Sequence, residues 1–561
     1  MKRKNIRQFT FLLCGIVLLA IVSTKYFFRI DLTAEKRYTL SAETKKVLSQ
    51  LDAPLYVNVF LDGDLPAQFR KFRNSIREML DDFKLYSGNR IFVYFFDPSD
   101  AASAQEREER YAMLYESGIQ GIAFQKNNKD GSLSQQIIFP GAIISYKDRQ
   151  LTVNLLKNST MLSTEAAINV SLEALEYELI KVVNSLSTDS IGTIALTTGR
   201  GELRRAEIED LGNELSSFYS LEFQTINGQL DALDRYKAVI IARPCEPFNE
   251  KDKFIIDRYI MRGGKVLWLI DGVQVNTDSL SSEMRMTIAL SNELNLEDQL
   301  FTYGVRVNHN VVQDFMSNVI AVTTDASSQL MPARWLYYPL VTPSQNHVIT
   351  RNLSPVWLRY ASEIDTVGRD GNIRKTVLLQ TSELSRVRGV PLMISLNEVQ
   401  QPIHPQQFNS PHRITAVLLE GSFPSVYRNR NARNLFPELQ ERQAERSSET
   451  KMIVVADGDI ARNDVRNTPN GIMASNPLGF DRFTRETFAN RDFLVNAINY
   501  LTDDAELMKL RNREFKLRLL DRQKVANEQL KWQIINIVLP MLLLITGGIA
   551  YNRHRKYRYG R

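Results

Sequence analysis

The chain has one long apolar stretch near each end, and basic residues flank both stretches on their outer side. Residues 9–22 read FTFLLCGIVLLAIV, and residues 534–551 read IINIVLPMLLLITGGIAY. A helix needs about 20 residues, with a range of about 17–25, to cross the hydrocarbon core of a membrane. The second stretch is long enough by itself, and the first becomes long enough if its helix continues towards Phe28. We therefore expect two transmembrane helices with a folded body between them.

The first stretch also fits a cleavable signal peptide, since a basic start and a short apolar run are typical of one. However, no small-x-small cleavage pattern follows Ala20. Leu13, which precedes Cys14, is too large for a lipoprotein processing site. We expect an uncleaved anchor within residues 1–29.

The flanking charges predict the orientation, because Lys and Arg mark the cytoplasmic side of a span. The basic residues outside the two spans are Lys2, Arg3, Lys4, Arg7, Arg553, Arg555, Lys556, Arg558 and Arg561. We expect both termini, including the tail 553–561, to be cytoplasmic and the body to lie outside the cytoplasm. The inner flanks also carry Lys and Arg, so the opposite orientation remains an alternative.

Composition limits the function of the body. Hydrophobic content of 43% and charged content of 24% are typical of a folded globular chain. The net charge of +6 comes largely from the ends, so nothing favours nucleic-acid binding. Cys14 and Cys245 are the only cysteines, which excludes a disulfide framework and Cys–Cys metal sites. A body outside the cytoplasm without disulfides fits a bacterial periplasm.

Residues 30–160 predict a first α/β domain. The expected order is β-α-β-α-β-β, with strands at 55–61, 91–96, 121–125 and within 142–156, and a helix at 69–86. With Pro140 just before a strand, this order resembles a thioredoxin-like fold. The Cys-x-x-Cys pair is absent, which excludes disulfide exchange and favours a recognition or spacer domain.

A linker helix at 161–187 leads to a second α/β domain at 188–502. Strands are expected at 191–199, 221–226, 238–244, 266–272 and 452–460, and helices at 202–218, 249–261 and 492–501. This alternation predicts a doubly wound parallel sheet of the amidotransferase or flavodoxin type. Residues 281–445 are expected to be an insertion.

Ligands of open α/β sheets bind beyond the carboxyl ends of the strands. Three such ends carry polar or glycine residues, at 198–202, 243–245 and 457–459. The candidate crevice for a ligand or partner is Arg200, Glu202, Asp457, Asp459 and Asn463. A tight strand-to-helix turn explains the glycines of 198–202 equally well.

No catalytic or metal motif is found. An EF-hand loop starting at Asp457 would need other residues than Ala461 and Arg462 at its fifth and sixth positions. Cys245 lies between Pro244 and Glu246 rather than on a Gly-x-Cys-x-Gly elbow. The five histidines show no ligand spacing. We expect a non-enzymatic protein without metal or cofactor.

A juxtamembrane helix is expected at 503–533, before the second span at 534–552. Leu507, Leu510, Leu517 and Leu520 recur at helical spacing among basic residues. The helix either packs on its own domain, or forms a stalk or docking face for a membrane partner.

Several stretches together resemble the GldG family of gliding-motility-associated ABC-transporter auxiliary proteins. They are DLTAEKRYTLS (31–41), FTYGVRVNHNVVQD (301–314), AVLLEGSFPSVYRNR (416–430), VVADGDIARND (454–464), FANRDFLVNAINYLTDD (488–504) and LRNREFKLRLLD (510–521). The resemblance implies a periplasmic, substrate-binding-like component that works with an ABC ATPase subunit and a membrane permease subunit. Arg200 stands where the family often has His in Gly-His-Gly-Glu.

The second domain also resembles the amidotransferase-like domain of intraflagellar transport proteins, where it serves assembly. We therefore expect a non-enzymatic subunit of an ABC-type complex in the bacterial inner membrane. The alternative is a membrane-tethered solute receptor that uses the crevice near Arg200 and Asp457. A tethered hydrolase or transferase is a third class, for which the sequence offers no site.

Overall fold

The computed structural model describes most of the body and the C-terminal helix. The described residues are 11, 13, 15, 39–127, 133–157, 163–188, 192–281, 285–324, 327–368, 371–430, 444–468, 471–474, 476–503, 506–512 and 522–559. The expected first span therefore lies outside the described residues, apart from three single positions. Contacts group residues 38–513 into one compact unit and residues 1–37 with 514–561 into another.

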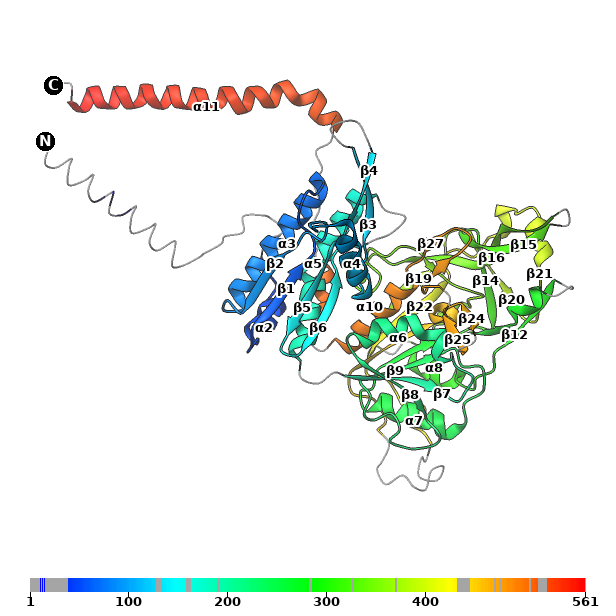
Figure 1. The fold of residues 1–561 in the computed structure, drawn as a ribbon. Coiled ribbons are helices and arrows are strands. Elements are labelled where there is room, and N and C mark those ends of the chain that lie inside the picture. Colours follow the sequence, from blue (N-terminus) through cyan, green and yellow to red (C-terminus); the bar gives the residue numbers. More distant parts are fainter. Residues whose placement is uncertain are drawn as a thin grey trace. The chain divides into compact units, whose positions relative to one another are not determined.

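The first part of the compact unit is a four-stranded sheet with helices (Figure 1). Its sheet has the order β2-β1-β5-β6, in which β1 and β2 are parallel and the other neighbours are antiparallel. The elements are α2 (Ala42–Ser49), β1 (Leu55–Val59), α3 (Ala67–Tyr86), β2 (Ile91–Phe95), α4 (Ala104–Glu116), β3 (Ile122–Asn127), β4 (Leu133–Ile138), β5 (Gly141–Tyr146), β6 (Arg149–Asn154) and α5 (Thr164–Ser187). The predicted strands and helices of this region are confirmed, although the stretch 142–156 forms a hairpin of two strands.

Side-chain periodicity explains this layer. Alternate residues of β1 are buried, as expected for a strand with one covered face. The buried residues of α3 recur at helical spacing and are Phe69, Phe72, Ile76, Leu80 and Phe83. Ser163 caps α5 by accepting the Ala166 N–H.

The second part of the unit contains a mixed sheet with the order β15-β16-β19-β22-β23-β10-β9-β7-β8. Its parallel core consists of β7 (Thr193–Thr198), β8 (Ser220–Thr225), β9 (Ala238–Ala242), β10 (Val266–Leu269) and β23 (Thr450–Val455). Counted along the chain, these five strands lie in the order 2-1-3-4-5, which is that of flavodoxin-like sheets.

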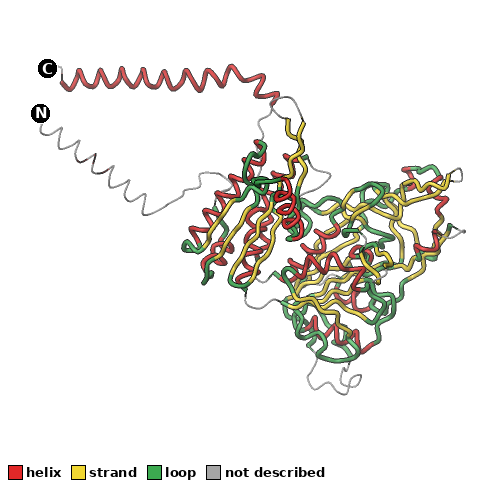
Figure 2. The backbone as a smooth tube through the Cα atoms, viewed as in Figure 1, coloured by secondary structure: helices red, strands yellow, loops and turns green. Residues whose placement is uncertain are grey.

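Helices cover both faces of the parallel core, as Figure 2 shows. On one face, α6 (Glu209–Ser216) and α10 (Asn490–Thr502) pack on residues such as Ile240. On the other face, α7 (Glu250–Met261) packs on Val239, Ile241 and Trp268. The strands are therefore buried on both sides, which explains their continuous apolar runs.

The remainder of this region corrects the expectation of a purely parallel sheet. The sheet is mixed, because β22 (Ile414–Gly421) pairs antiparallel with β23 and β19 (Ile373–Gln380) pairs antiparallel with β22. The stretch 281–445 thus supplies strands to the main sheet, besides smaller sheets of its own. Its other elements are β12 (Met286–Ser291), α8 (Glu297–Tyr303), β13 (Val305–Val307), β14 (Asn310–Asp314), β15 (Ser317–Thr324), β16 (Ser327–Pro343), β17 (Val356–Trp357), β18 (Ile364–Thr366), β20 (Ser385–Gly389) and β21 (Leu392–Ser395), while β11 (Val273–Val275) precedes it.

After this part come short strands and the C-terminal helix. The short strands are β24 (Val465–Thr468), β25 (Gly471–Ala474), β26 (Phe480–Asp481) and β27 (Glu486–Thr487). Helix α11 (Arg522–Tyr559) is continuous, and its segment Lys531–Arg558 is long and apolar enough to cross a membrane, since its most apolar 18-residue window has a mean hydropathy of 2.1. Of the helix expected at 503–533, residues Leu507–Asn512 form a 3-10 helix and residues from Arg522 onward belong to α11, while residues 513–521 lie outside the described residues.

Candidate functional site

The loop after β7 forms one end of a pocket of about 630 Å³. The carboxyl ends of β7 and β8 and the first turn of α7 surround it. The lining residues are Thr198, Gly199, Arg200, Glu202, Thr225, Ile226, Asn227, Gly228, Phe248, Asn249, Glu250, Lys251 and Asp252. Two of the five predicted crevice residues, Arg200 and Glu202, lie here.

Arg200 is held in place within the pocket. Its guanidinium donates to Asp252 Oδ2 at 2.5 Å and to the Pro247 carbonyl at 3.2 Å. Its backbone N–H donates to Glu202 Oε2 at 2.6 Å, and its carbonyl accepts the N–H groups of Cys245 and Glu246. The loop after β7 is thereby tied to the loop after β9, so Arg200 positions this edge of the sheet.

A second group of polar residues gathers at the carboxyl ends of β9, β10 and β23. Arg243 Nε lies 2.9 Å from Asp459 Oδ1 and 3.4 Å from Asp271 Oδ2. Asp457 is fully buried and accepts the N–H groups of Arg359, at 2.6 Å, and Asp459, at 2.8 Å. Gly458 N–H donates to Asp271 Oδ1 at 2.6 Å. Two carboxyl groups, those of Asp459 and Asp271, thus flank the Arg243 guanidinium, and the Asp457 carboxyl group interacts with both of them.

Burial and mutual repulsion shift the protonation of these carboxyl groups. Burial, together with the charge of Asp459, raises the pKa of Asp271 to about 7, although Arg243 opposes the shift. Burial and the neighbouring Asp271 hold the pKa of Asp457 well above its usual range. Carboxyl groups this close do not all ionise together, so the group retains a proton near neutral pH.

Asn463 joins this second group to the helix that follows β7. Its Oδ1 accepts the Asp210 N–H at 3.1 Å, and its own N–H donates to the Glu207 carbonyl at 2.7 Å. Arg462 lies 3.3 Å from Glu207 and 3.4 Å from Asp459. Asn463 therefore connects the loop after β23 to the start of α6 through its hydrogen bonds.

The five predicted crevice residues follow strands that end at the same side of the parallel core, but they fall into two groups. Arg200 and Glu202 face the pocket beside β8, whereas Asp457, Asp459 and Asn463 belong to the carboxyl cluster beside β10. Their role in binding stays a prediction. Sequence reasoning missed Asp271 and Arg243 as members of the cluster, although both stand at predicted strand ends.

The arrangement offers little for catalysis or metal binding. Across the described residues, no group of three or more His, Cys, Asp or Glu side chains is placed to hold a metal ion. Burial raises the pKa of the Cys245 thiol, so this cysteine is not activated as a thiolate. The carboxyl groups of the cluster already accept hydrogen bonds from backbone N–H groups or pair with Arg243.

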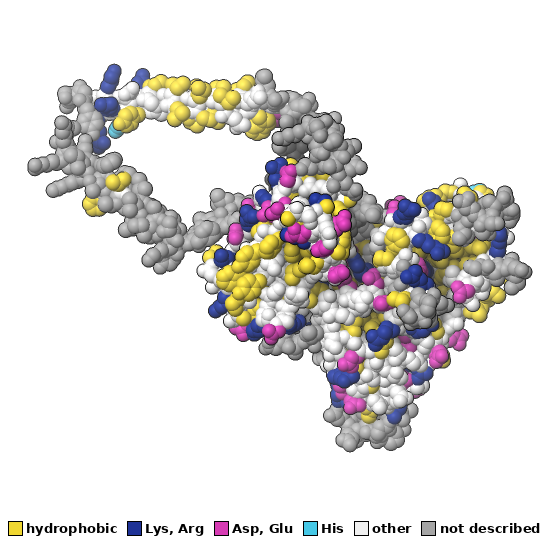
Figure 3. Space-filling view, viewed as in Figure 1, with side chains coloured by type: hydrophobic (Ala, Val, Ile, Leu, Met, Phe, Trp, Pro, Cys, Tyr) yellow, Lys and Arg dark blue, Asp and Glu magenta, His cyan; other side chains and the backbone are white. Residues whose placement is uncertain are grey.

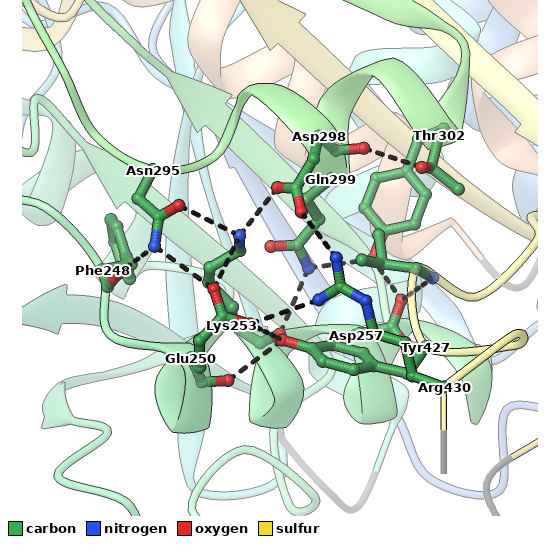
Figure 4. Close-up of polar contacts among 12 residues, drawn as sticks. Phe248, Glu250, Lys253, Asp257, Asn295, Asp298, Gln299, Thr302, Tyr427 and Arg430 are labelled. Atoms are coloured by element: carbon green, nitrogen blue, oxygen red, sulfur yellow. Dashed lines mark hydrogen bonds and ion pairs between the residues drawn. The ribbon is translucent and has the colours of Figure 1, made fainter. Parts of the chain in front are cut away.

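A further polar network was not foreseen from the sequence (Figure 4). Asp257 of α7 is fully buried and accepts the hydroxyl groups of Tyr303 and Ser425, both at 2.7 Å, and the Val426 N–H at 3.2 Å. Lys253, also buried, donates to Asp298 at 2.7 Å. The network fastens α8 and the segment after β22 to α7. The one signal in the sequence was Asp257 itself, an acidic residue at a position of α7 where an apolar residue would be expected.

Comparison with known proteins identifies the family to which the chain belongs. The family model described as an ABC-type uncharacterized transport system matches residues 192–497, and a domain of unknown function (DUF7088) matches residues 34–145. A protein of Borreliella burgdorferi described as uncharacterized is 20% identical over 547 residues, which cover 94% of each chain.

Among solved structures, the N-terminal domain of mmIFT52 is similar at 14% identity, with a TM-score of 0.32. This likeness covers 55% of the chain and 97% of that domain, and it is too low to support an argument about the fold. The family match, in contrast, covers more than half of the 561 residues and includes both groups of strand-end residues. The chain therefore belongs to the ABC-type uncharacterized transport system family of auxiliary proteins.

Proposed function

We propose that the chain is a membrane-anchored, non-enzymatic subunit of a gliding-motility-associated ABC complex of the GldG type. An ABC ATPase subunit and a membrane permease subunit are its proposed partners. The proposed location is the bacterial inner membrane. In the proposed topology the chain has two spans, both termini lie in the cytoplasm, and the body lies in the periplasm. The family match supports the general part of this proposal, which is an accessory role in an ABC-type transport system.

The observation that carries the proposal is the exposed apolar segment Lys531–Arg558. None of its most apolar window is buried by the rest of the chain. Its exposed side chains include Leu543, Leu544 and Ile545, which are 64%, 78% and 58% exposed. An apolar surface of this extent requires lipid or a partner. Trp532 and Tyr551 lie near the ends of the apolar stretch, as interfacial aromatic residues do.

The strand orders support the proposed domains. The order β2-β1-β5-β6 supports a thioredoxin-like domain at 30–160, and the 2-1-3-4-5 order supports an amidotransferase-like domain at 188–502.

Affinity purification in mild detergent tests the complex. We expect the full chain to co-purify with one ATPase and one permease in a fixed ratio. A variant truncated before Lys531 should lose both, whereas a control in which residues 534–551 are replaced by leucines keeps the anchor. Retention of the partners by the truncated variant would contradict a coupling role for this helix.

A second candidate is a tethered solute receptor, favoured by the pocket of about 630 Å³ beside Arg200. Under this alternative, the chain purifies alone and native mass spectrometry detects a bound small molecule. Arg200→Ala should then release that molecule. If the ATPase and permease co-purify and no solute is detected, the receptor function is rejected.

A further inference from the structure

Three arginines of the region 281–445 make no ion pair within the part of the chain that the structure describes. They are Arg334 on β16, and Arg386 and Arg388 on β20. By contrast, Arg306 of the same region pairs with Asp365 at 2.6 Å. In Figure 3, Lys and Arg side chains lie beside hydrophobic ones over the part of the molecule that Figure 1 labels β16. The described chain therefore leaves these three charges without an opposite charge beside them.

Two of the arginines lie on one face of a two-stranded ladder. Strand β20 pairs antiparallel with β14, and Arg386 lies opposite Gln313. Because alternate residues of a strand point to the same side, Arg386 and Arg388 share this face. Leu384, which is 37% exposed, directly precedes the strand, and its carbonyl accepts the Phe315 N–H at 2.9 Å. The row thus begins with an apolar side chain and continues with two cations.

Aromatic rings support two of the guanidinium groups. Arg334 lies over the Phe315 ring, 4.8 Å from its centroid, and Arg386 lies over the Phe408 ring at 4.9 Å. The two rings contact each other edge to face, with centroids 6.3 Å apart. A stacked guanidinium keeps N–H donors at its edge, where a planar carboxylate can accept two of them. The ring pair therefore joins the two cations into one surface.

Neutral amides orient Arg386 without cancelling its charge. Its Nε donates to Gln313 Oε1 at 2.6 Å, and its Nη1 donates to Gln407 Oε1 at 2.8 Å. Gln313 is fully buried, so the position of its amide is fixed by packing. Arginine has five N–H donors, and these two bonds leave others for a further partner. Burial and the neighbouring Arg388 lower the pKa of Arg386, and an anion beside it would oppose this shift.

The acidic side chains of this region do not pair with the three arginines. Glu398 accepts the Tyr337 hydroxyl at 3.0 Å and the Ser395 N–H at 3.1 Å. Asp314 is fully buried and accepts backbone N–H groups at 2.7 and 2.8 Å. Glu383 is exposed and makes no ion pair with the described residues. A carboxylate from another molecule can therefore pair with the arginines without breaking an existing ion pair.

We propose that the arginine surface, which consists of Arg334, Arg386, Arg388 and Leu384, binds an acidic segment of a partner protein. Asp or Glu side chains of the segment pair with the guanidinium groups, and an apolar side chain covers Leu384. Arginine and aromatic residues are enriched at protein interfaces, and complementary charge selects the partner. This interaction goes beyond the proposed function and does not depend on it.

The partial burial of the cations favours a protein segment over other anionic partners. Arg386 and Arg388 are only partly exposed, so the anionic group has to project towards them. A carboxylate at the end of a side chain does so, whereas the phosphates of a membrane lie in a broad plane. Nucleic-acid binding needs a larger basic surface, and the net charge of +6 lies largely at the chain ends.

Titration with a peptide tests the surface in the full chain, held in phosphatidylcholine nanodiscs. The probe is a labelled peptide of Glu-Leu-Glu repeats, and its control has Gln in place of Glu. We expect fluorescence anisotropy to show saturable binding of the acidic peptide alone, weakened by added salt. Arg386→Gln and Arg388→Gln should each weaken binding about tenfold, because each removes a charged hydrogen-bond donor.

Arg306→Gln is the matched control. It removes the same charge from the same region, but Arg306 is 55% exposed and already pairs with Asp365. The affinity of this variant for the acidic peptide should equal that of the wild type. Should Arg386→Gln fail to fold, Arg388→Gln tests the same surface without removing the bonds to Gln313 and Gln407.

Three results would overturn the proposal. They are a wild type that does not bind the acidic peptide, equal binding of the Gln peptide, and an equal loss of binding in Arg306→Gln. Binding to phosphatidylglycerol vesicles that is lost in Arg388→Gln, without binding of the peptide, would assign the surface to an anionic membrane instead.

Discussion

At the scale of single residues, the buried carboxyl groups of Asp271 and Asp457 make the stability of the body depend on pH. An unfolded aspartate ionises near pH 3.8, whereas burial and Asp459 raise the pKa of folded Asp271 to about 7. Between these values the folded chain keeps a proton that the unfolded chain has lost. The contribution of Asp271 to the free energy of unfolding therefore falls as pH rises, by at most about 1.4 kcal/mol per pH unit, and levels off above its folded pKa.

We expect Asp271→Asn to remove this slope, because an amide keeps the acceptor for the Gly458 N–H but does not titrate. The thermal midpoint of the variant, relative to the wild type, should rise from about pH 4 to about pH 7. Asp365→Asn is the control of opposite sign. Partial burial raises the pKa of Asp365, but hydrogen bonds from Asn308 and Arg306 lower this pKa by more, so the net shift is downward. Asp365→Asn should therefore lose stability, relative to the wild type, only at higher pH. Parallel pH profiles for Asp271→Asn and the wild type would contradict the assignment.

The sequence could identify part of this cluster. Asp457 and Asp459 were predicted because they follow a recognisable buried strand. Arg243 and Asp271 also stand at predicted strand ends. Their contact depends on which strands are neighbours, and strand order is set by packing between residues that are distant in the chain. A sequence pattern therefore gives the position of each residue along a strand, but not its partner across the sheet.

At the scale of elements, Asp257 fastens the segment after β22 to α7. We expect Asp257→Ala to remove the acceptor of two buried hydroxyl groups and of the part-buried Val426 N–H, and to cost about 3 kcal/mol of unfolding free energy. Amide exchange of Val426, whose N–H bonds to Asp257, should accelerate. Arg262→Ala, at the end of α7, is the control, since the Arg262 side chain is 43% exposed in its pair with Asp234 and its loss should cost about 1 kcal/mol or less. Unchanged exchange at Val426 in Asp257→Ala would refute this role.

Most helices and strands could be predicted, because local periodicity and caps specify them. Asn249, for example, caps α7 by accepting the Asp252 N–H at 2.8 Å. The helix expected at 202–218 begins later, at Glu209, because tertiary contacts hold its first residues. Leu203 N–H donates to the Ala242 carbonyl at 3.0 Å, which keeps this segment beside β9. No periodicity within the segment could have revealed that bond.

At the scale of the whole molecule, the proposed topology places Met113 and Tyr557 on opposite sides of the membrane. Both side chains are exposed, at 64% and 92%. In a background without Cys14 and Cys245, we expect Met113→Cys to react with an impermeant thiol reagent in intact spheroplasts. Tyr557→Cys should react only after lysis. The reverse pattern would place the body in the cytosol.

Strand β23 has a consequence for how the chain is made. It lies between β10 and β22, and its residue Met452 pairs with Val266, 186 positions earlier (452 minus 266). At about 5–20 residues per second, synthesis reaches β23 roughly 10–40 s after β10. During this interval the nascent sheet exposes the apolar edge of β10. We therefore expect chaperone dependence to be greatest while the stretch between these strands is being translated.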